Sequence, residues 1–208
     1  HLDAAQRAFE SINAPLPPEL EAERYNLQAR LYIDTGRYAD AVALLNSWSG
    51  DETWSAYANY NTGVALVRMG ELQAGAALLD RVGTMSAVDE ETRSLRDQAN
   101  VALGFSFLQA QLDGNARPVL QRVRLNGPFS NKALLGVGWA DSAGEQYKKA
   151  LGAWLELSER DLLDSAVQES LLAVPYAYAQ LGADPQAAEH YARALDVFGT
   201  QLARLNNA

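Results

Sequence analysis

Residues 135–154 read LGVGWADSAGEQYKKALGAW, and the spacing of small and large residues in this stretch decides the fold. The small residue Gly136 is followed three positions later by Trp139, and the small residue Ala150 is followed four positions later by Trp154. Both spacings place the two side chains on one face of a helix. A small residue where two helices cross lets the backbones approach closely, and the large side chain fills the space beside the crossing. The stretch therefore predicts two helices packed against each other across a short turn.

The same two spacings recur along the chain at a period of about 34 to 40 residues, which is typical of a repeated helix–turn–helix unit. The pairs spaced by three are Ala29/Tyr32, Gly63/Leu66, Gly104/Phe107, Gly136/Trp139 and, with proline as the first member, Pro175/Tyr178. The pairs spaced by four are Ala5/Phe9, Ala41/Leu45, Gly75/Leu79, Ala116/Leu120, Ala150/Trp154 and Ala187/Tyr191.

Glycine and proline mark where the predicted helices end or bend. Pro118 is tolerated only in a first turn, so its helix is predicted to begin near Ala116. Pro175 is predicted to kink the helix expected over residues 167–181. A glycine also lies between the two helices of each pair, where we expect the left-handed conformation that ends a helix. These glycines are Gly36, Gly70, Gly114, Gly144 and Gly182.

The stretch 135–154, together with residues 36–41, resembles the signature of the tetratricopeptide repeat (TPR) family. The resemblance implies an all-α fold, a right-handed superhelical solenoid of about five TPR-like repeats preceded by a half repeat. Because the chain opens on amphipathic residues without an initiating Met, we expect a fragment of a longer protein, whose upstream repeats contact the half repeat. We predict a single domain over residues 1–208, with a half repeat over 1–14 and repeats over 21–49, 55–83, 90–126, 130–158 and 165–199.

The composition supports helices and excludes several classes of protein. The chain holds 36 Ala and 30 Leu against 12 Val and 2 Ile, which favours helices over strands. Its formal net charge of −9, with 17 scattered basic residues, argues against a nucleic-acid partner. The absence of cysteine excludes disulfides, thiolate metal sites and a Cys nucleophile. No apolar run reaches the roughly 18 residues of a membrane helix, so we predict no membrane span.

The sequence offers few groups for catalysis or metal binding. His190 is the one histidine inside the chain, so no pair of imidazoles is available there. The acidic stretches 89–91 and 158–161 lack the spaced oxygen ligands of a calcium loop and are typical of helix starts. We therefore predict a non-catalytic protein with no metal and no cofactor. The carboxylates that could perform acid–base chemistry are interpreted as a solvated face; they are Asp141, Glu145 and Glu156.

The resemblance also implies where a partner binds. In the TPR family the first helix of each unit lines the concave groove, at fixed positions relative to the small crossing residue. One subset of the family grips a carboxylate terminus with Lys and Asn at such positions, but the matching positions here lack Lys, so we do not expect that clamp. We expect the rings of Tyr60 and Phe105 to be less buried than the core rings of Tyr32 and Phe107. The candidate groove residues are Asn26, Arg30, Asp34, Tyr57, Tyr60, Val64, Arg68, Val101, Phe105, Gln109, Asp141, Leu172 and Tyr176.

These patterns predict a protein–protein interaction scaffold that binds an extended peptide or an amphipathic helix of a partner protein. Two alternatives stay open. One is a carbohydrate-binding scaffold in polysaccharide export, with Tyr57, Tyr60, Phe105 and Tyr176 stacking on sugars. The other is the regulatory part of an enzyme whose catalytic domain lies outside this chain. The last two units resemble bacterial envelope TPR proteins, which implies a periplasmic or envelope-associated location rather than a cytoplasmic one.

Overall fold

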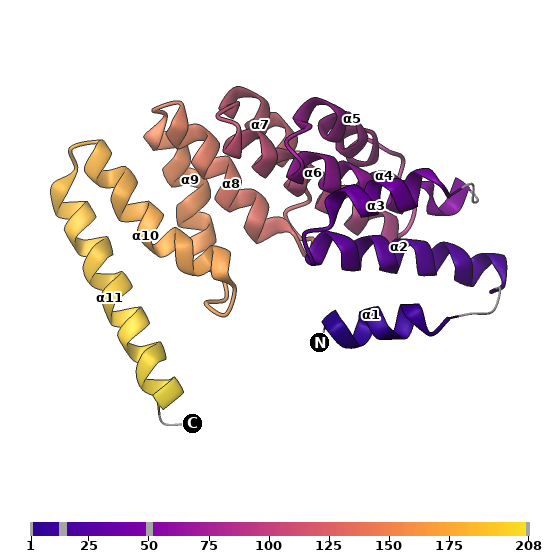
Figure 1. Ribbon diagram of the computed structural model, residues 1–208. Coiled ribbons are helices and arrows are strands. Elements are labelled where there is room, and N and C mark those ends of the chain that lie inside the picture. The colour runs from indigo at the N-terminus through magenta and orange to yellow at the C-terminus, as the bar shows by residue number, and fades with distance from the viewer. Residues whose placement is uncertain (1, 13–15, 49–51, 207–208) are drawn as a thin grey trace. The chain divides into compact units, whose positions relative to one another are not determined.

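The computed structural model describes residues 2–12, 16–48 and 52–206, and within these residues every regular element is an α-helix (Figure 1). The predicted all-α fold is therefore confirmed. The predicted end of the half repeat at residue 14 and of the first repeat at residue 49 lie outside the described residues. The helices are α1 (Leu2–Glu10), α2 (Pro18–Asp34), α3 (Tyr38–Asn46), α4 (Glu52–Arg68), α5 (Leu72–Gly83), α6 (Glu90–Gln109), α7 (Asp113–Leu120), α8 (Ser130–Ala143), α9 (Tyr147–Ser158), α10 (Ser165–Gln180) and α11 (Asp184–Asn206).

The chain divides into two compact units, which we describe separately. Unit 1 covers His1–Ser106 and unit 2 covers Phe107–Ala208. In unit 1, α2 pairs with α3, α4 pairs with α5, and α1 lies on α2. In unit 2, α7 packs on α8, α8 on α9, and α10 on both α9 and α11. The single domain predicted over residues 1–208 stays a prediction.

The helix crossings of unit 1 lie at the small residues that the sequence pattern selected. Ala29 on α2 and Ala41 on α3 are completely buried in one core cluster. Between α4 and α5, a Cβ atom added to Gly75 would lie 2.7 Å from the Gly63 carbonyl oxygen. Real Cβ atoms do not approach a backbone oxygen so closely, so this crossing requires glycine at position 75.

The core of unit 2 contains a crossing that the pattern did not identify. The Trp154 ring is completely buried, and its indole N–H donates to the Leu135 carbonyl at 3.1 Å. The ring lies over Gly138, where an added Cβ would be 2.0 Å from the indole nitrogen. Gly138, two residues after the predicted crossing residue Gly136, therefore makes room for the largest side chain of this core.

The turn inside each helix pair has one geometry, repeated five times. A backbone N–H after the turn donates to a carbonyl five residues earlier, the longer bond of a Schellman motif. The residue just before that N–H has a positive φ: Gly36, Gly70 and Gly182 as predicted, but Gln111 and Glu145 in the other two turns. The bonds join Arg37 to Tyr32, Glu71 to Leu66, Leu112 to Phe107, Gln146 to Asp141 and Ala183 to Tyr178, at 2.7 to 3.0 Å.

The prediction for Gly114 and Gly144 was therefore wrong. Gly144 has a φ of −83°, and Gly114 lies inside α7. Hydrogen-bond geometry, rather than the presence of a glycine nearby, fixes which residue of the turn becomes left-handed. Those positions hold Gln111 and Glu145, whose side chains are exposed.

The two prolines lie within helices. The helix of Pro118 begins at Asp113, earlier than the predicted start near Ala116, so that prediction was wrong. Pro118 occupies the second turn, and the helix ends two residues later at Leu120. α10 runs from Ser165 to Gln180 with Pro175 inside it and buried. The predicted kink at Pro175 stays a prediction.

Candidate functional site

Five of the predicted groove residues of unit 1 line a polar pocket of about 470 Å³. Side chains from α2, α4 and α6 line it, with one from α3. The predicted residues among them are Arg30, Asp34, Tyr60, Val64 and Arg68. The remaining lining residues are Ile33, Tyr38, Asn61 and Gln98. We call this cavity the polar pocket.

Two lining residues that were not predicted, Gln98 and Tyr38, lie at sequence positions related to the repeat pattern. Gln98 lies six residues before the crossing glycine Gly104, just as Tyr57 lies six residues before Gly63. Extending the predicted groove positions by one helical turn would have found Gln98. Tyr38 lies two residues after the turn glycine Gly36, and it is half-buried at the pocket.

Two asparagines link the helices beneath the pocket. The Asn61 side-chain amide donates to the Asn26 side-chain oxygen at 3.3 Å, which joins α4 to α2. The Asn26 amide in turn donates to the Ala22 carbonyl at 3.0 Å. Both asparagines are buried. Asn26 was predicted to contact a partner, but its buried side chain is not available to one. Its role is to hold the two groove helices together.

The pocket is rich in hydrogen-bond donors. Burial raises the pKa of the Tyr60 phenol, and the charge of Arg30 and a hydrogen bond with Gln98 offset part of that rise. The phenol therefore stays protonated at neutral pH. Arg30 and Arg68 have exposed side chains, and neither forms an ion pair within the described part of the chain. Asp34 adds one carboxylate to the lining, so the pocket carries two positive charges and one negative charge.

The Tyr57 side chain, on the same helix as Tyr60, forms its contacts with other residues of unit 1. Its hydroxyl forms a hydrogen bond with the Glu91 carboxylate of α6. Burial first, and then this bond, raise the pKa of the Tyr57 phenol. Its ring packs with Tyr60 against the buried Val82, Leu95 and Ala99.

The predicted groove residues of α6 differ in exposure. Val101 is buried and therefore not available to a partner, which corrects the prediction for this residue. Gln109 is exposed, and Phe105 is half-buried. Tyr60, Phe105, Tyr32 and Phe107 are all half-buried, so the expected difference between groove and core rings stays a prediction. Position relative to the crossing residue does not by itself determine how far a side chain is covered.

Asp141 of unit 2 is a structural residue. It is buried, and its carboxylate pairs with the Arg117 guanidinium across α7 and α8, with a 2.6 Å distance between Nε and Oδ1. Its prediction as a groove residue was therefore wrong, since a partner cannot reach it. The Arg117 side chain is 38% exposed, so the pair is buried on the Asp141 side alone, and removal of Arg117 would leave the buried carboxylate without its counter-charge.

Leu172 and Tyr176 of α10 are exposed, as a partner site requires. Tyr176 belongs to an aromatic cluster: its ring centroid lies 6.3 Å from that of Trp139 and 6.3 Å from that of Tyr147. The Trp139 indole N–H donates to the exposed Glu169 carboxylate at 2.7 Å. We call Trp139, Tyr147 and Tyr176 the aromatic patch of unit 2.

His190 and the acidic side chains are the described groups that could ligate a metal ion. His190 stacks on the Tyr178 ring, with 5.1 Å between the ring centroids. Within the described residues, no three His, Asp or Glu side chains are grouped so that they could hold a metal ion. In that same part of the chain, no helix combines the length and the apolar character needed to cross a membrane.

Comparison with known proteins identifies solved structures with a similar fold. No protein-family model matches the sequence, and no curated protein matches it. Among solved structures, MamA from Desulfovibrio magneticus RS-1 is 21% identical, with a TM-score of 0.67 over 86% of this chain and 96% of that one. A second MamA structure, MSR-1, is 19% identical, with a TM-score of 0.64 over 88% of this chain and 99% of that one.

A second protein with helical repeats has a similar fold. The putative kinesin light chain of Podosopora anserina, described as having nearly identical TPR-like repeats, is 16% identical. Its TM-score is 0.67, over 90% of this chain and 99% of that one. These similarities agree with the five repeated turns, and they confirm the fold that the sequence spacing predicted. This chain has the fold of the tetratricopeptide repeat solenoids.

Proposed function

We propose that this chain is a non-catalytic protein-interaction scaffold, and that the polar pocket of unit 1 binds an acidic side chain of a partner protein. The observation that carries the proposal is the position of Arg30 and Arg68 beside one pocket, because neither guanidinium forms an ion pair with any residue that the structure describes. A carboxylate is the natural ligand for such groups, because an Arg can donate two parallel hydrogen bonds to its oxygens.

The neighbouring groups support the same ligand. The protonated Tyr60 phenol and the Gln98 amide add neutral donors. Ile33 and Val64 supply apolar walls for the aliphatic part of a Glu or Asp side chain. Asp34 disfavours a ligand that is negative throughout, and it can accept a hydrogen bond from a backbone N–H or a basic group of the same partner. An extended peptide with one acidic side chain at the pocket meets all of these conditions.

The proposal is tested with a display library of random peptides carrying amidated C-termini, so that only side-chain carboxylates are selected. We expect the bound peptides to share an Asp or Glu at one position. Arg68→Ala should weaken the selected peptide about tenfold or more, because a charged hydrogen bond contributes roughly 1.5–3 kcal/mol.

A matched control is Arg81→Ala, which removes the same charge from an exposed position on α5 away from the pocket. It should leave the affinity unchanged. The proposal fails if the selected peptides have no common acidic residue, or if Arg68→Ala binds them as wild type does.

One observation favours the sugar-binding alternative as a second candidate. The aromatic patch of unit 2 presents the exposed Tyr176, and its Trp139 binds the Glu169 carboxylate, a combination that can stack on a sugar ring and accept its hydroxyls. Selective binding on a glycan array that is lost in Tyr176→Ala would support it. The regulatory role and the periplasmic location stay predictions.

A further inference from the structure

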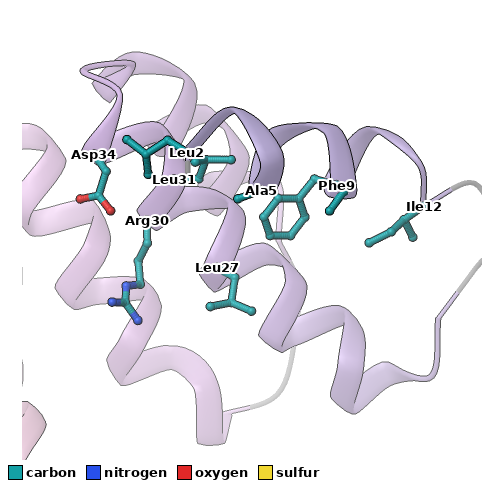
Figure 2. Close-up of a pocket in the computed structure, with 9 residues that line it drawn as sticks. Leu2, Ala5, Phe9, Ile12, Leu27, Arg30, Leu31 and Asp34 are labelled. Carbon is teal, nitrogen blue, oxygen red and sulfur yellow. The ribbon is translucent and has the colours of Figure 1, made fainter.

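An apolar groove lies between α1 and α2. Figure 2 shows Phe9 and Ala5 of α1 facing Leu27 and Leu31 of α2 across an open space. The cavity has a volume of about 430 Å³, and its lining is almost entirely aliphatic or aromatic. Leu27 remains 45% exposed. The full lining is Leu2, Ala5, Ala8, Phe9, Ile12, Leu27, Arg30, Leu31 and Asp34.

A second apolar surface lies on α11. This helix has 23 residues against the 16 of its partner α10, and it packs on α10 through the buried Ala187 and Ala194. On another side it carries Leu195, Leu202 and Leu205, which are 74%, 61% and 75% exposed. With Tyr191 and Phe198 they form a stripe spaced alternately by four and three residues, which lies along one face of a helix. We call these five residues the leucine stripe.

The groove and the stripe fit each other in shape. An amphipathic helix binds a hydrophobic groove through side chains at positions i, i+3, i+4 and i+7. The leucine stripe has that spacing, and the groove is bounded by two helices with a cavity between them.

The charges at the two surfaces are also complementary. Arg30 and Asp34 are the charged residues of the groove lining. Asp196 and Arg204 border the leucine stripe and are exposed. Each surface thus offers one positive and one negative side chain, so opposite charges can face each other across the contact.

We propose that the chain associates with itself head to tail, the leucine stripe of one copy lying in the α1–α2 groove of the next. Every copy has one groove and one leucine stripe. It can therefore place its stripe in the groove of one neighbour and receive the stripe of another neighbour in its own groove. A contact of this heterologous kind leaves a free groove and a free stripe on every dimer, and it therefore continues to rings or filaments. The polar pocket is not part of the contact apart from Arg30 and Asp34, which line both cavities.

Analytical ultracentrifugation of the whole chain tests the proposal with two single-face variants. Leu202→Glu disables the stripe and leaves the groove, whereas Leu27→Glu disables the groove and leaves the stripe. We expect the mass of the wild type to rise with concentration and each variant to stay at the monomer mass. An equimolar mixture of the two variants should show twice the monomer mass and no more, because one intact stripe meets one intact groove.

Thr200→Glu is the matched control, because it adds the same charge to an exposed position of α11 outside the stripe. It should associate as wild type does. Circular dichroism confirms that each variant is folded. The proposal is overturned if the wild type stays monomeric at every concentration, or if Leu27→Glu alone still dimerises, which would indicate pairing of two α11 helices. It is also overturned if Thr200→Glu is as defective as Leu202→Glu.

Discussion

The sequence predicts the left-handed residue correctly in three of the five turns and not in the other two. Gly36, Gly70 and Gly182 adopt a positive φ, as their residue type predicts. Gln111 and Glu145 adopt the same conformation at φ values of 58° and 57°, although each has a Cβ atom that glycine lacks. For a residue with a Cβ atom the left-handed region costs roughly 1–2 kcal/mol. The repeated turn geometry is maintained against this cost by the packing of the helices on either side.

We predict that Glu145→Gly raises the free energy of unfolding by about 0.5–1 kcal/mol. The substitution relieves the left-handed strain, and the greater freedom of glycine in the unfolded chain cancels part of the gain. Urea denaturation measures the change. Gly36→Ala should act in the opposite direction, since its φ is +76°. A loss of stability in Glu145→Gly would show that the Glu145 side chain contributes more than its conformation costs.

At the scale of helices, the close crossings decide which substitutions the fold tolerates. Gly138 on α8 and Gly152 on α9 are both helical glycines of unit 2. A Cβ added to Gly138 would meet the buried Trp154 ring, whereas one added to Gly152 would have no other atom within 4 Å. The two positions therefore separate the packing of a crossing from the intrinsic helix preference of alanine.

We predict that Gly138→Ala lowers the free energy of unfolding by about 1–3 kcal/mol, the usual cost of overpacking a core. The added methyl group must displace the Trp154 ring and weaken its bond to the Leu135 carbonyl. Gly152→Ala, the matched control, should stabilise by up to about 1 kcal/mol through helix propensity. Chemical denaturation followed by tryptophan fluorescence measures both. Equal effects of the two substitutions would contradict the close packing over Gly138.

At the scale of the whole molecule, the fold was predictable and the site only in part. Pairs of a small and a large residue, three or four positions apart, recur once in each repeat unit. These pairs therefore identify each helix crossing. The same positions gathered Arg30, Tyr60 and Arg68 at one pocket. They could not show that Asn26 and Asp141 are covered, because burial depends on neighbouring helices that the position within one helix does not specify. The exposed stripe of α11 was missed for the same reason.

Each copy has a net charge of −9, so two copies repel each other. This repulsion gives the proposed self-association a predictable salt dependence. Like-charged molecules repel over the screening length, which falls from about 30 Å at 0.01 M salt to about 10 Å at 0.1 M. The contact itself buries leucine side chains, and added salt does not weaken the burial of apolar side chains. We therefore predict that the dissociation constant of self-association, measured by sedimentation, falls several-fold over this range. If it rises instead, ion pairs at Arg30 and Asp34 hold the copies together, and the leucine stripe is not the principal contact.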